Sequence, residues 1–182
     1  MRKSTFLIVV SIALLFASCV SKEEKPENKI KVPDLSLYEF QQTKDVVQLV
    51  YDAVNEIELK GIDAFAQFRV EGSKWYNGDT YVFVWGIDGL RYVYPPNPAV
   101  EGVNLKDLKD INDKPIGQEF IDAANQGEGW VSYMWTKPDS SIPQKKMTFI
   151  KRAVDHDGKV YLVGCGLYDM PQEKIFEDES NI

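Results

Sequence analysis

The chain has 182 residues, a formal net charge of −7 and 44% hydrophobic residues. Its length suits one domain with a sizeable core, and its acidity excludes a surface made for nucleic acid or anionic lipid. One histidine and two cysteines offer few ways to build a nucleophile–base pair, so we expect no enzyme and no catalytic residue. A pair of carboxylates brought together by the fold stays open, and with it a hydrolase.

Residues 1–18 are predicted to be a signal peptide of the lipoprotein type. Arg2 and Lys3 precede an apolar run over 6–17, which is shorter than the about 20 residues that span a bilayer. The run ends in Leu-Phe-Ala-Ser before Cys19, which resembles the lipobox of bacterial lipoproteins, where the cysteine is acylated. Phe16 departs from the usual aliphatic residue, so ordinary cleavage or an uncleaved anchor stays open. Each alternative places the domain outside the cytoplasm, on the periplasmic face or the cell surface.

The rest of the chain divides by composition. Residues 19–33 are charged and contain proline, which predicts a flexible tether, and residues 171–182 form an acidic tail. Between them, 34–170 is predicted to be a single domain. Loss of the leader takes the net charge to about −9 by counting its two cations. Cys165 lies between apolar neighbours, so we interpret it as a buried small hydrophobe without a disulfide partner.

Three helices are predicted. The capping-box spacing of Ser36 to Glu39 indicates that the first helix begins there, and Lys60-Gly61 ends it. A short second helix is expected over 63–68. A third runs from about Pro115 to Gln126 and is capped by Asp113. The apolar stripe of the first helix is Phe40, Val47, Val50, Val54 and Ile57.

Alternating aromatic residues predict the strands. They cover 80–86, 90–94, 129–138, 146–154 and 159–168, with tight turns at Asp88-Gly89 and Asp157-Gly158. Connections this short require antiparallel neighbours, so we expect an α+β domain with about five antiparallel strands and the helices on one side. Tyr133 and Trp135 share a face, where they either wall a pocket or fill a core.

Several sequence words, taken in order, resemble the single-Cache family of extracytoplasmic sensor domains. They are Tyr81 to Gly89, Tyr94-Pro95-Pro96-Asn97-Pro98, Glu101 to Leu105, Asp110 with Lys114-Pro115, Gly129 to Pro138, Lys146 with Phe149, and Gly164 to Tyr168. The resemblance implies a PAS-like antiparallel sheet, a long N-terminal helix, a short helix in the mid-chain loop, and a pocket for a small organic acid. It implies no cofactor and no metal.

The same resemblance implies the site residues. Tyr81, Phe83, Tyr133 and Trp135 would wall the pocket, Lys146 or Arg91 would supply a cation for a carboxylate, and Tyr94 would supply a hydroxyl. Solvent exposure is the alternative for both cations. Tyr94 stands where the family commonly has histidine, and Phe149 where tyrosine is common. The sequence ends at Ile182 without a kinase module, so we expect a partner such as a sensor kinase, chemoreceptor or transporter.

The alternative function is a structural or protein-interaction envelope lipoprotein whose pocket is collapsed. His156 lies in an Asp-His-Asp-Gly turn, where a solvated side chain is expected rather than a metal ligand or a general base. The glycines of Gly164-Cys165-Gly166 lie inside a strand pattern, where they indicate either a bulge or a close approach of another group.

Overall fold

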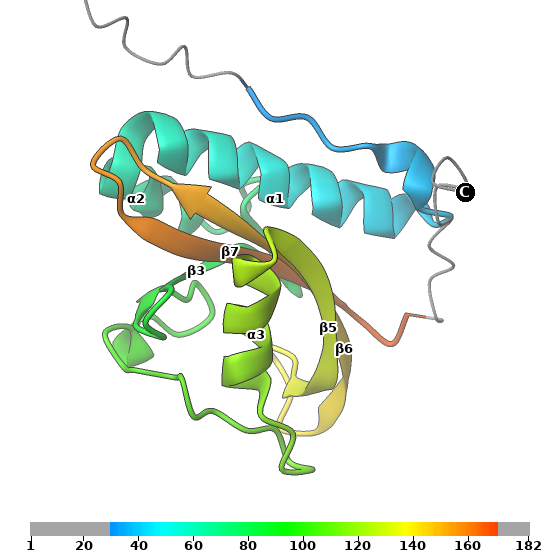
Figure 1. The fold of residues 1–182 in the computed structure, drawn as a ribbon. Coiled ribbons are helices and arrows are strands. Elements are labelled where there is room, and N and C mark those ends of the chain that lie inside the picture. The colour runs from blue at the N-terminus through cyan, green and yellow to red at the C-terminus, as the bar shows by residue number, and fades with distance from the viewer. Residues whose placement is uncertain (1–29, 171–182) are drawn as a thin grey trace, which may run out of the picture.

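The computed structural model describes residues 30–170. Helix α1 (Gln41–Lys60) crosses one face of a five-stranded antiparallel sheet, and helix α3 (Ile116–Asn125) covers the other face (Figure 1). The expectation of helices on one side is therefore wrong. The central strands are apolar on both faces, as all four residues of β3 (Phe83–Gly86) are buried, so each face needs a cover.

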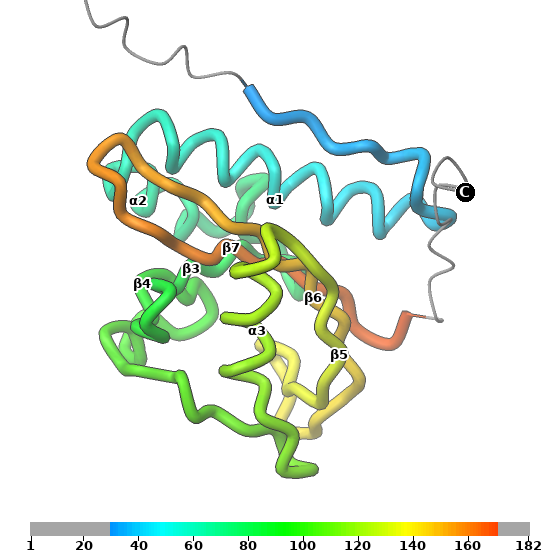
Figure 2. The backbone as a smooth tube through the Cα atoms, in the orientation of Figure 1, coloured from blue at the N-terminus to red at the C-terminus, as the bar shows by residue number. Residues whose placement is uncertain are grey.

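The order of the strands in the sheet is β4-β3-β7-β6-β5 (Figure 2). The last three in the chain form a meander, with the longest strand in the middle of it. Strands β3 and β4 form the first hairpin, and β3 joins it to the meander by pairing with β7. The bounds of the other strands are β4 Arg91–Val93, β5 Glu128–Thr136, β6 Pro143–Val154 and β7 Val160–Tyr168.

The strand predicted over 80–86 is broken at Val82. β2 (Thr80–Tyr81) pairs with β1 (Tyr76–Asn77) in a separate two-stranded sheet, while Val82 donates its N–H to Trp75 O at 2.9 Å. A two-residue strand has too few positions for a periodic signal, which is why β1 was not predicted. The predicted alternation survives the break, because Tyr81 and the aromatic residues of β3 lie in the same hydrophobic cluster.

The prediction that the first helix begins at Ser36 is wrong. Asp34 accepts hydrogen bonds from the N–H and the hydroxyl of Ser36, at 3.0 and 2.6 Å, and so caps a separate 3-10 turn, η1 (Leu35–Leu37). Tyr38 is then extended, and α1 begins three residues later. The serine hydroxyl was engaged by the preceding aspartate and was not free to cap α1.

The apolar stripe of α1 is confirmed over Val47, Val50, Val54 and Ile57, which are almost fully buried against the sheet. Phe40, predicted as its first member, is instead the extended N-cap residue and is only partly buried. Gly61 ends the helix with φ +60° and donates its N–H to Ile57 O, as expected of a glycine at this position. The 3-10 turn η2 (61–64) and α2 (Phe65–Phe68) follow and confirm the short second helix.

The predicted cap of α3 is wrong, although the helix itself is confirmed. Asp113 has φ +62° and lies in a tight turn, and the residue at the N-cap position is Pro115, which has no side chain to cap with. Gly127 (φ +102°) follows the helix, as predicted.

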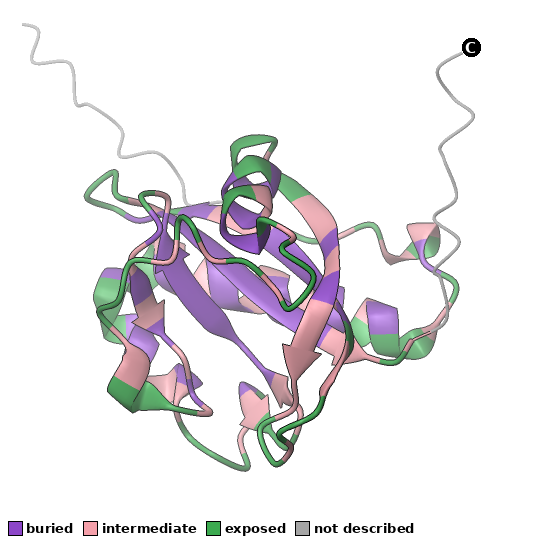
Figure 3. Ribbon diagram, turned by 90° about the horizontal axis from the view of Figure 1, so that it is seen from below, coloured by how far each residue is buried: buried purple, intermediate pink, exposed green. Residues whose placement is uncertain are grey.

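Two apolar clusters, one on each face of the sheet, hold the layers together. The cluster under α1 contains the helix stripe, Phe149 and Cys165, and the cluster under α3 contains Phe83 and Phe120. Buried residues follow the central strands, whereas exposed ones lie mainly in turns and loops (Figure 3). Within the described residues, no helix is long and apolar enough to cross a membrane.

The described chain begins with an extended segment beside α1 (Figure 1), where Lys31 hydrogen-bonds Asn55 and pairs with Glu58 at 2.6 Å. The expected leader, the Cys19 lipidation site and the acidic tail lie outside the described residues.

Candidate functional site

A small cavity lies between α3 and the sheet, on the face away from α1. It is enclosed by strands β2 to β5, by α3, and by the segment that leads from β4 to α3. Its volume is about 20 Å³, which is room for about one water molecule. Its lining residues are Tyr81, Phe83, Trp85, Arg91, Tyr94, Leu108, Ile116, Phe120, Tyr133 and Trp135.

Six of the seven predicted site residues line this one cavity; the seventh, Lys146, lies behind Tyr81. The aromatic walls are locked by ring contacts: Phe120 of α3 lies 5.6 Å from Phe83 and 5.3 Å from Tyr133, measured between ring centroids. Trp135 lies 5.9 Å from Tyr133. The ring faces and edges therefore fill most of the space between the helix and the sheet.

The mainly apolar walls of the cavity carry a few polar groups, most of them hydroxyls. The hydroxyl of Tyr133 hydrogen-bonds Thr148 at 2.9 Å, and Trp135 Nε1 donates to the hydroxyl of Tyr94 at 3.3 Å. Burial raises the pKa of Tyr133 and raises that of Tyr81 far above the ordinary value, so both phenols stay protonated and able to donate.

Arg91 is a buried cation in the cavity wall, with 7% of its surface exposed. Its guanidinium stacks on the Tyr94 ring at 4.5 Å, but its Nε has no hydrogen-bond partner, and it forms no ion pair within residues 30–170. The nearby acid, Glu101, is engaged by Arg69 at 2.7 Å and by the backbone N–H of Tyr94. Burial lowers the pKa of Arg91, as expected for a charge without an acidic partner.

Lys146 is a second buried cation, with 1% of its surface exposed. Its ammonium donates to the hydroxyls of Tyr81 at 2.8 Å and Tyr168 at 3.2 Å and lies over both rings. No carboxylate of the described chain pairs with it. Burial lowers the pKa of Lys146 to about 7, far from its ordinary value of 10.5.

The segment between β4 and α3 closes the cavity and is fastened to the edge strand β5. Asp110 accepts the N–H of Met134 at 3.0 Å, and Lys114 donates to the carbonyl of Ser132. These side chains hydrogen-bond backbone groups of β5 that would otherwise be free to pair with a further strand. Leu108 lies in the fastened segment and lines the cavity, so the fastening holds one wall in place.

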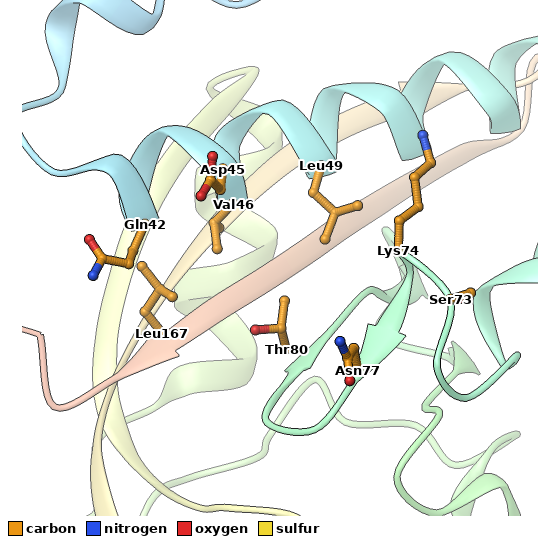
Figure 4. A pocket seen from close by; sticks show the side chains of 9 residues that line it. All are labelled: Gln42, Asp45, Val46, Leu49, Ser73, Lys74, Asn77, Thr80 and Leu167. Carbon is orange, nitrogen blue, oxygen red and sulfur yellow. The ribbon is translucent and has the colours of Figure 1, made fainter.

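A larger hollow of about 400 Å³ lies on the opposite side of the sheet, between α1 and the β1–β2 hairpin (Figure 4). Val46, Leu49 and Leu167 form its apolar side, and Lys74 is its one cation. Because Lys74 pairs with Asp52 at 3.0 Å, this hollow offers no unpaired cation, and its other charged lining residue is the carboxylate Asp45. None of the predicted site residues lines it.

His156 lies at the β6–β7 turn, where it does not line the cavity and 57% of its side chain is exposed. Among residues 30–170, no group of three or more histidine, cysteine, aspartate or glutamate side chains is arranged to hold a metal ion. Cys165 is buried under α1, and burial raises the pKa of its thiol to about 11.

A family model described as a Cache domain matches residues 39–168, which is more than half of the chain. This chain belongs to the Cache family. The predicted resemblance is thereby confirmed. Cache domains are extracytoplasmic sensor modules that bind ligands and are not catalytic, so the Cache domain here is a sensor domain.

Two curated relatives resemble the Cache domain over about half of this chain. The sensor histidine kinase MctS of Rhizobium johnstonii is 33% identical over 93 residues, and the methyl-accepting chemotaxis protein McpP of Pseudomonas putida is 26% identical over 94. Each alignment covers 51% of this chain but only 20% and 17% of the two relatives.

Solved structures show the same fold. A periplasmic sensor domain of a chemotaxis protein is 28% identical, with a TM-score of 0.53, and the match covers 67% of this chain and 86% of that one. A methyl-accepting chemotaxis protein from Vibrio parahaemolyticus is 21% identical, with a TM-score of 0.55, over 70% of this chain and 88% of that one. The predicted α+β, PAS-like fold is confirmed.

Sequence reasoning missed several residues of the Cache domain's cavity. Trp85 lies in the aromatic strand predicted over 80–86 but was not predicted as a site residue, and Leu108 lies in a loop without a periodic pattern. Phe120 was missed because the helices were expected on one side, which would have left α3 away from this face. Tyr168 was read only as a strand end, although its hydroxyl holds Lys146 and donates to Thr136 O at 2.9 Å.

Proposed function

We propose that this Cache domain binds a small organic acid in the aromatic cavity and passes its occupancy to a partner protein. The observation that carries the proposal is the presence of two buried cations, Arg91 and Lys146, without an acidic partner in the described chain. A buried charge is costly unless it is paired. An anion supplied from outside would pair with Arg91 in the cavity wall and would lie on the other side of Tyr81 from Lys146.

The chemistry of the walls favours a carboxylate as that anion. Arg91 presents a planar guanidinium that suits bidentate contact with a carboxylate, and Tyr81 and Tyr94 offer hydroxyls. The aromatic rings fit a short apolar chain. One solved structure of this fold is described as the structural basis for carboxylic acid recognition by a Cache chemosensory domain. It is 24% identical, with a TM-score of 0.50, over 59% of this chain and 70% of that one, so the likeness concerns the fold alone.

The small volume of the cavity means that an acid has to displace part of the wall. The cavity has room for about one water molecule, whereas even a short carboxylic acid such as acetate has four heavy atoms. The segment that carries Leu108 has no strand and only one short 3-10 turn, η3 (Pro98–Val100), so we expect it to move when the acid binds. Ligand binding and movement of this segment are then one event, which gives the partner a change to read.

Titration of the full chain, purified in a mild detergent, with acetate, propionate, pyruvate and succinate at pH 6 tests this proposal. Binding of an acid raises the midpoint of thermal unfolding according to RT ln(1 + [L]/Kd). Arg91→Met is expected to weaken the bound acid at least tenfold, because a charged hydrogen bond contributes about 1.5–3 kcal/mol. Lys74→Met is the matched control, since this lysine belongs to the other hollow.

No stabilisation by any acid of the panel, or equal affinity in Arg91→Met and the parent chain, would contradict the proposal. The alternative function, an envelope lipoprotein with a collapsed pocket and a role in structure or protein interaction, is favoured by one observation: the cavity has room for about one water. Under that alternative the acids leave the unfolding midpoint unchanged.

The cellular setting is part of the proposal. Lipidation at Cys19 would hold the domain at the cell envelope, and a sensor kinase, a chemoreceptor or a transporter would receive the signal. The lipoprotein-like leader supports the anchor, and the kinase and chemotaxis relatives support the kind of partner. Labelling of the cells with a clickable fatty acid tests the anchor, since Cys19→Ser is expected to remove the label.

A further inference from the structure

We propose that the domain takes up a proton at Lys146 when it binds an organic acid, so that its affinity for the acid depends on the pH outside the cell. This inference rests on the proposed function of the same cavity. It adds a consequence that the carboxylate site alone does not imply, which is that binding and protonation are one coupled step.

The argument begins with the surroundings of the amine. Lys146 is 1% exposed, and its hydrogen-bond partners are two neutral hydroxyls, those of Tyr81 and Tyr168. The Tyr168 hydroxyl donates to Thr136 O and therefore accepts from Lys146 in either state. The Tyr81 hydroxyl can accept from an ammonium or donate to a neutral amine, so the same cage fits both protonation states. A carboxylate in that position would have fixed the proton on the lysine.

The space around the Lys146 side chain is tight. A Cβ added to Gly166 of β7 would lie 2.7 Å from Lys146 Cε and 2.4 Å from Thr148 Oγ1. The glycine therefore leaves the space through which the lysine side chain runs beneath β7. The close approach predicted as one alternative at this glycine is confirmed, and the side chains that approach are Thr148 and Lys146.

None of the charged and titratable groups around Lys146 in the described chain supplies an anion that pairs with its ammonium. Asp79, at the β1–β2 turn, pairs with Lys137 at 3.4 Å and so is engaged elsewhere. Burial raises the pKa of the Cys165 thiol and of the Tyr81, Tyr133 and Tyr168 phenols, so these groups carry no negative charge near pH 7. Tyr94 after β4 and the cation Arg91 on β4 complete the surroundings.

Burial accordingly lowers the pKa of Lys146 to about 7, against the weaker opposite influence of Cys165 and Asp79. A carboxylate bound beside Tyr81, whose ring lines the cavity and whose hydroxyl contacts Lys146, favours the ammonium form and raises that pKa again. At pH values above about 7 the free amine then takes a proton from solvent as the acid binds. Short organic acids are already ionised there, so the ligand does not supply the proton.

Calorimetric titration in buffers of different ionisation enthalpy measures this uptake directly. With propionate or acetate, and the full chain in detergent, we expect about one proton taken up per acid at pH 8 and close to none at pH 6. The affinity is expected to fall up to about tenfold per pH unit above pH 7. Lys146→Met is expected to bind more weakly and to lose the proton uptake.

Two controls separate Lys146 from other groups. Lys145→Met changes the exposed neighbour on the same strand, and His156→Gln removes the one histidine of the sequence, so both are expected to keep the uptake. Binding at pH 6 without uptake at pH 8, or uptake that persists in Lys146→Met, overturns the coupling and leaves the proposed function standing. Absence of binding at pH 6 and pH 8 overturns both.

Discussion

The two faces of the sheet are built from similar apolar strands but differ in what they bury. Under α1, valines, Ile57 and Phe149 form a cluster that contains no lysine or arginine in the described chain. Under α3, Arg91 and Lys146 are buried among tyrosines and tryptophans. The first face gains stability from burial, whereas the second bears the cost of two buried cations, which a ligand would offset under the proposed function.

This contrast is clearest at adjacent positions of strand β6. Phe149 points toward α1, and Thr148 beside it points toward the cavity, where it meets Tyr133. Because side chains alternate along a strand with a period of two residues, β6 contributes to the apolar cluster on one face and to the cavity side on the other. A change on one face should affect stability, and a change on the other should affect ligand binding and pH dependence.

The largest effect is expected from Phe149→Ala on the α1 face. The ring packs against Trp130 at 5.2 Å and Tyr51 at 6.4 Å, and its loss leaves a cavity that costs about 3–5 kcal/mol of unfolding free energy. Urea denaturation measures the loss. The affinity for an acid in the folded fraction should stay within about twofold of the parent chain, and a large drop would show that the two faces are not separable.

The next largest effect is the pH dependence of stability that Lys146 creates. Its pKa is about 7 in the folded chain and 10.5 in its ordinary state, so between these values the unfolded chain holds the extra proton. The free energy of unfolding therefore rises with pH by roughly 1.4 kcal/mol per unit across that window, and the full cost of the buried charge is present below pH 7.

Lys146→Met is expected to flatten this rise, and Lys145→Met to keep it. Denaturation at several pH values between 6 and 10, without ligand, gives the slopes. Equal slopes in the parent and in Lys146→Met would show that the amine is not neutralised in the folded state, and the contrast between the two faces would then lose its electrostatic basis.

A smaller effect is expected from Gly166→Ala. The added methyl group would overlap Thr148 Oγ1 and Lys146 Cε, so we expect a loss of about 1–3 kcal/mol and weaker acid binding together. Gly129→Ala is the matched strand control, because its Cβ would meet Ala123 Cβ at an acceptable 3.4 Å. If both variants lose stability but neither loses acid affinity, Gly166 serves packing alone.

The sequence predicted the first face better than the second, for a physical reason. The stripe of α1 and the end at Gly61 follow from local rules, namely helical spacing and a left-handed glycine. Six cavity residues were found because strand alternation and the family resemblance put aromatics on one face. The cage around Lys146 depends on Tyr81 and Tyr168, which lie far apart in sequence, so no local pattern showed that this lysine is buried without an acid.

The same limit explains the loop that closes the cavity. Asp110 was noticed as part of a sequence word, but its role depends on Met134, 24 residues away. The predicted start of the first helix at Ser36 was wrong for the opposite reason, because the competing partner is local. Asp34, two residues earlier, accepts the hydrogen bond of the Ser36 hydroxyl. Sequence spacing identifies which groups are able to bond, and the fold decides which partner each one takes.

The smallest effect on stability, and the sharpest test of how the cavity opens, is expected from Asp110→Ala. The carboxylate accepts the backbone N–H groups of Met134, Asn112 and Lys114. Its removal takes away one of the two side-chain bonds that fasten the covering segment to β5 and leaves the bond from Lys114 to Ser132 O, at a cost of about 1–2 kcal/mol. Stopped-flow measurement of tryptophan fluorescence should show faster association of propionate than in the parent chain, because the closed state is then less populated. Asp107→Ala, an exposed change in the same segment, should leave the rate unchanged. An unaltered rate in Asp110→Ala would mean that the acid reaches the cations by displacing the aromatic wall of β5 rather than the segment that Asp110 fastens.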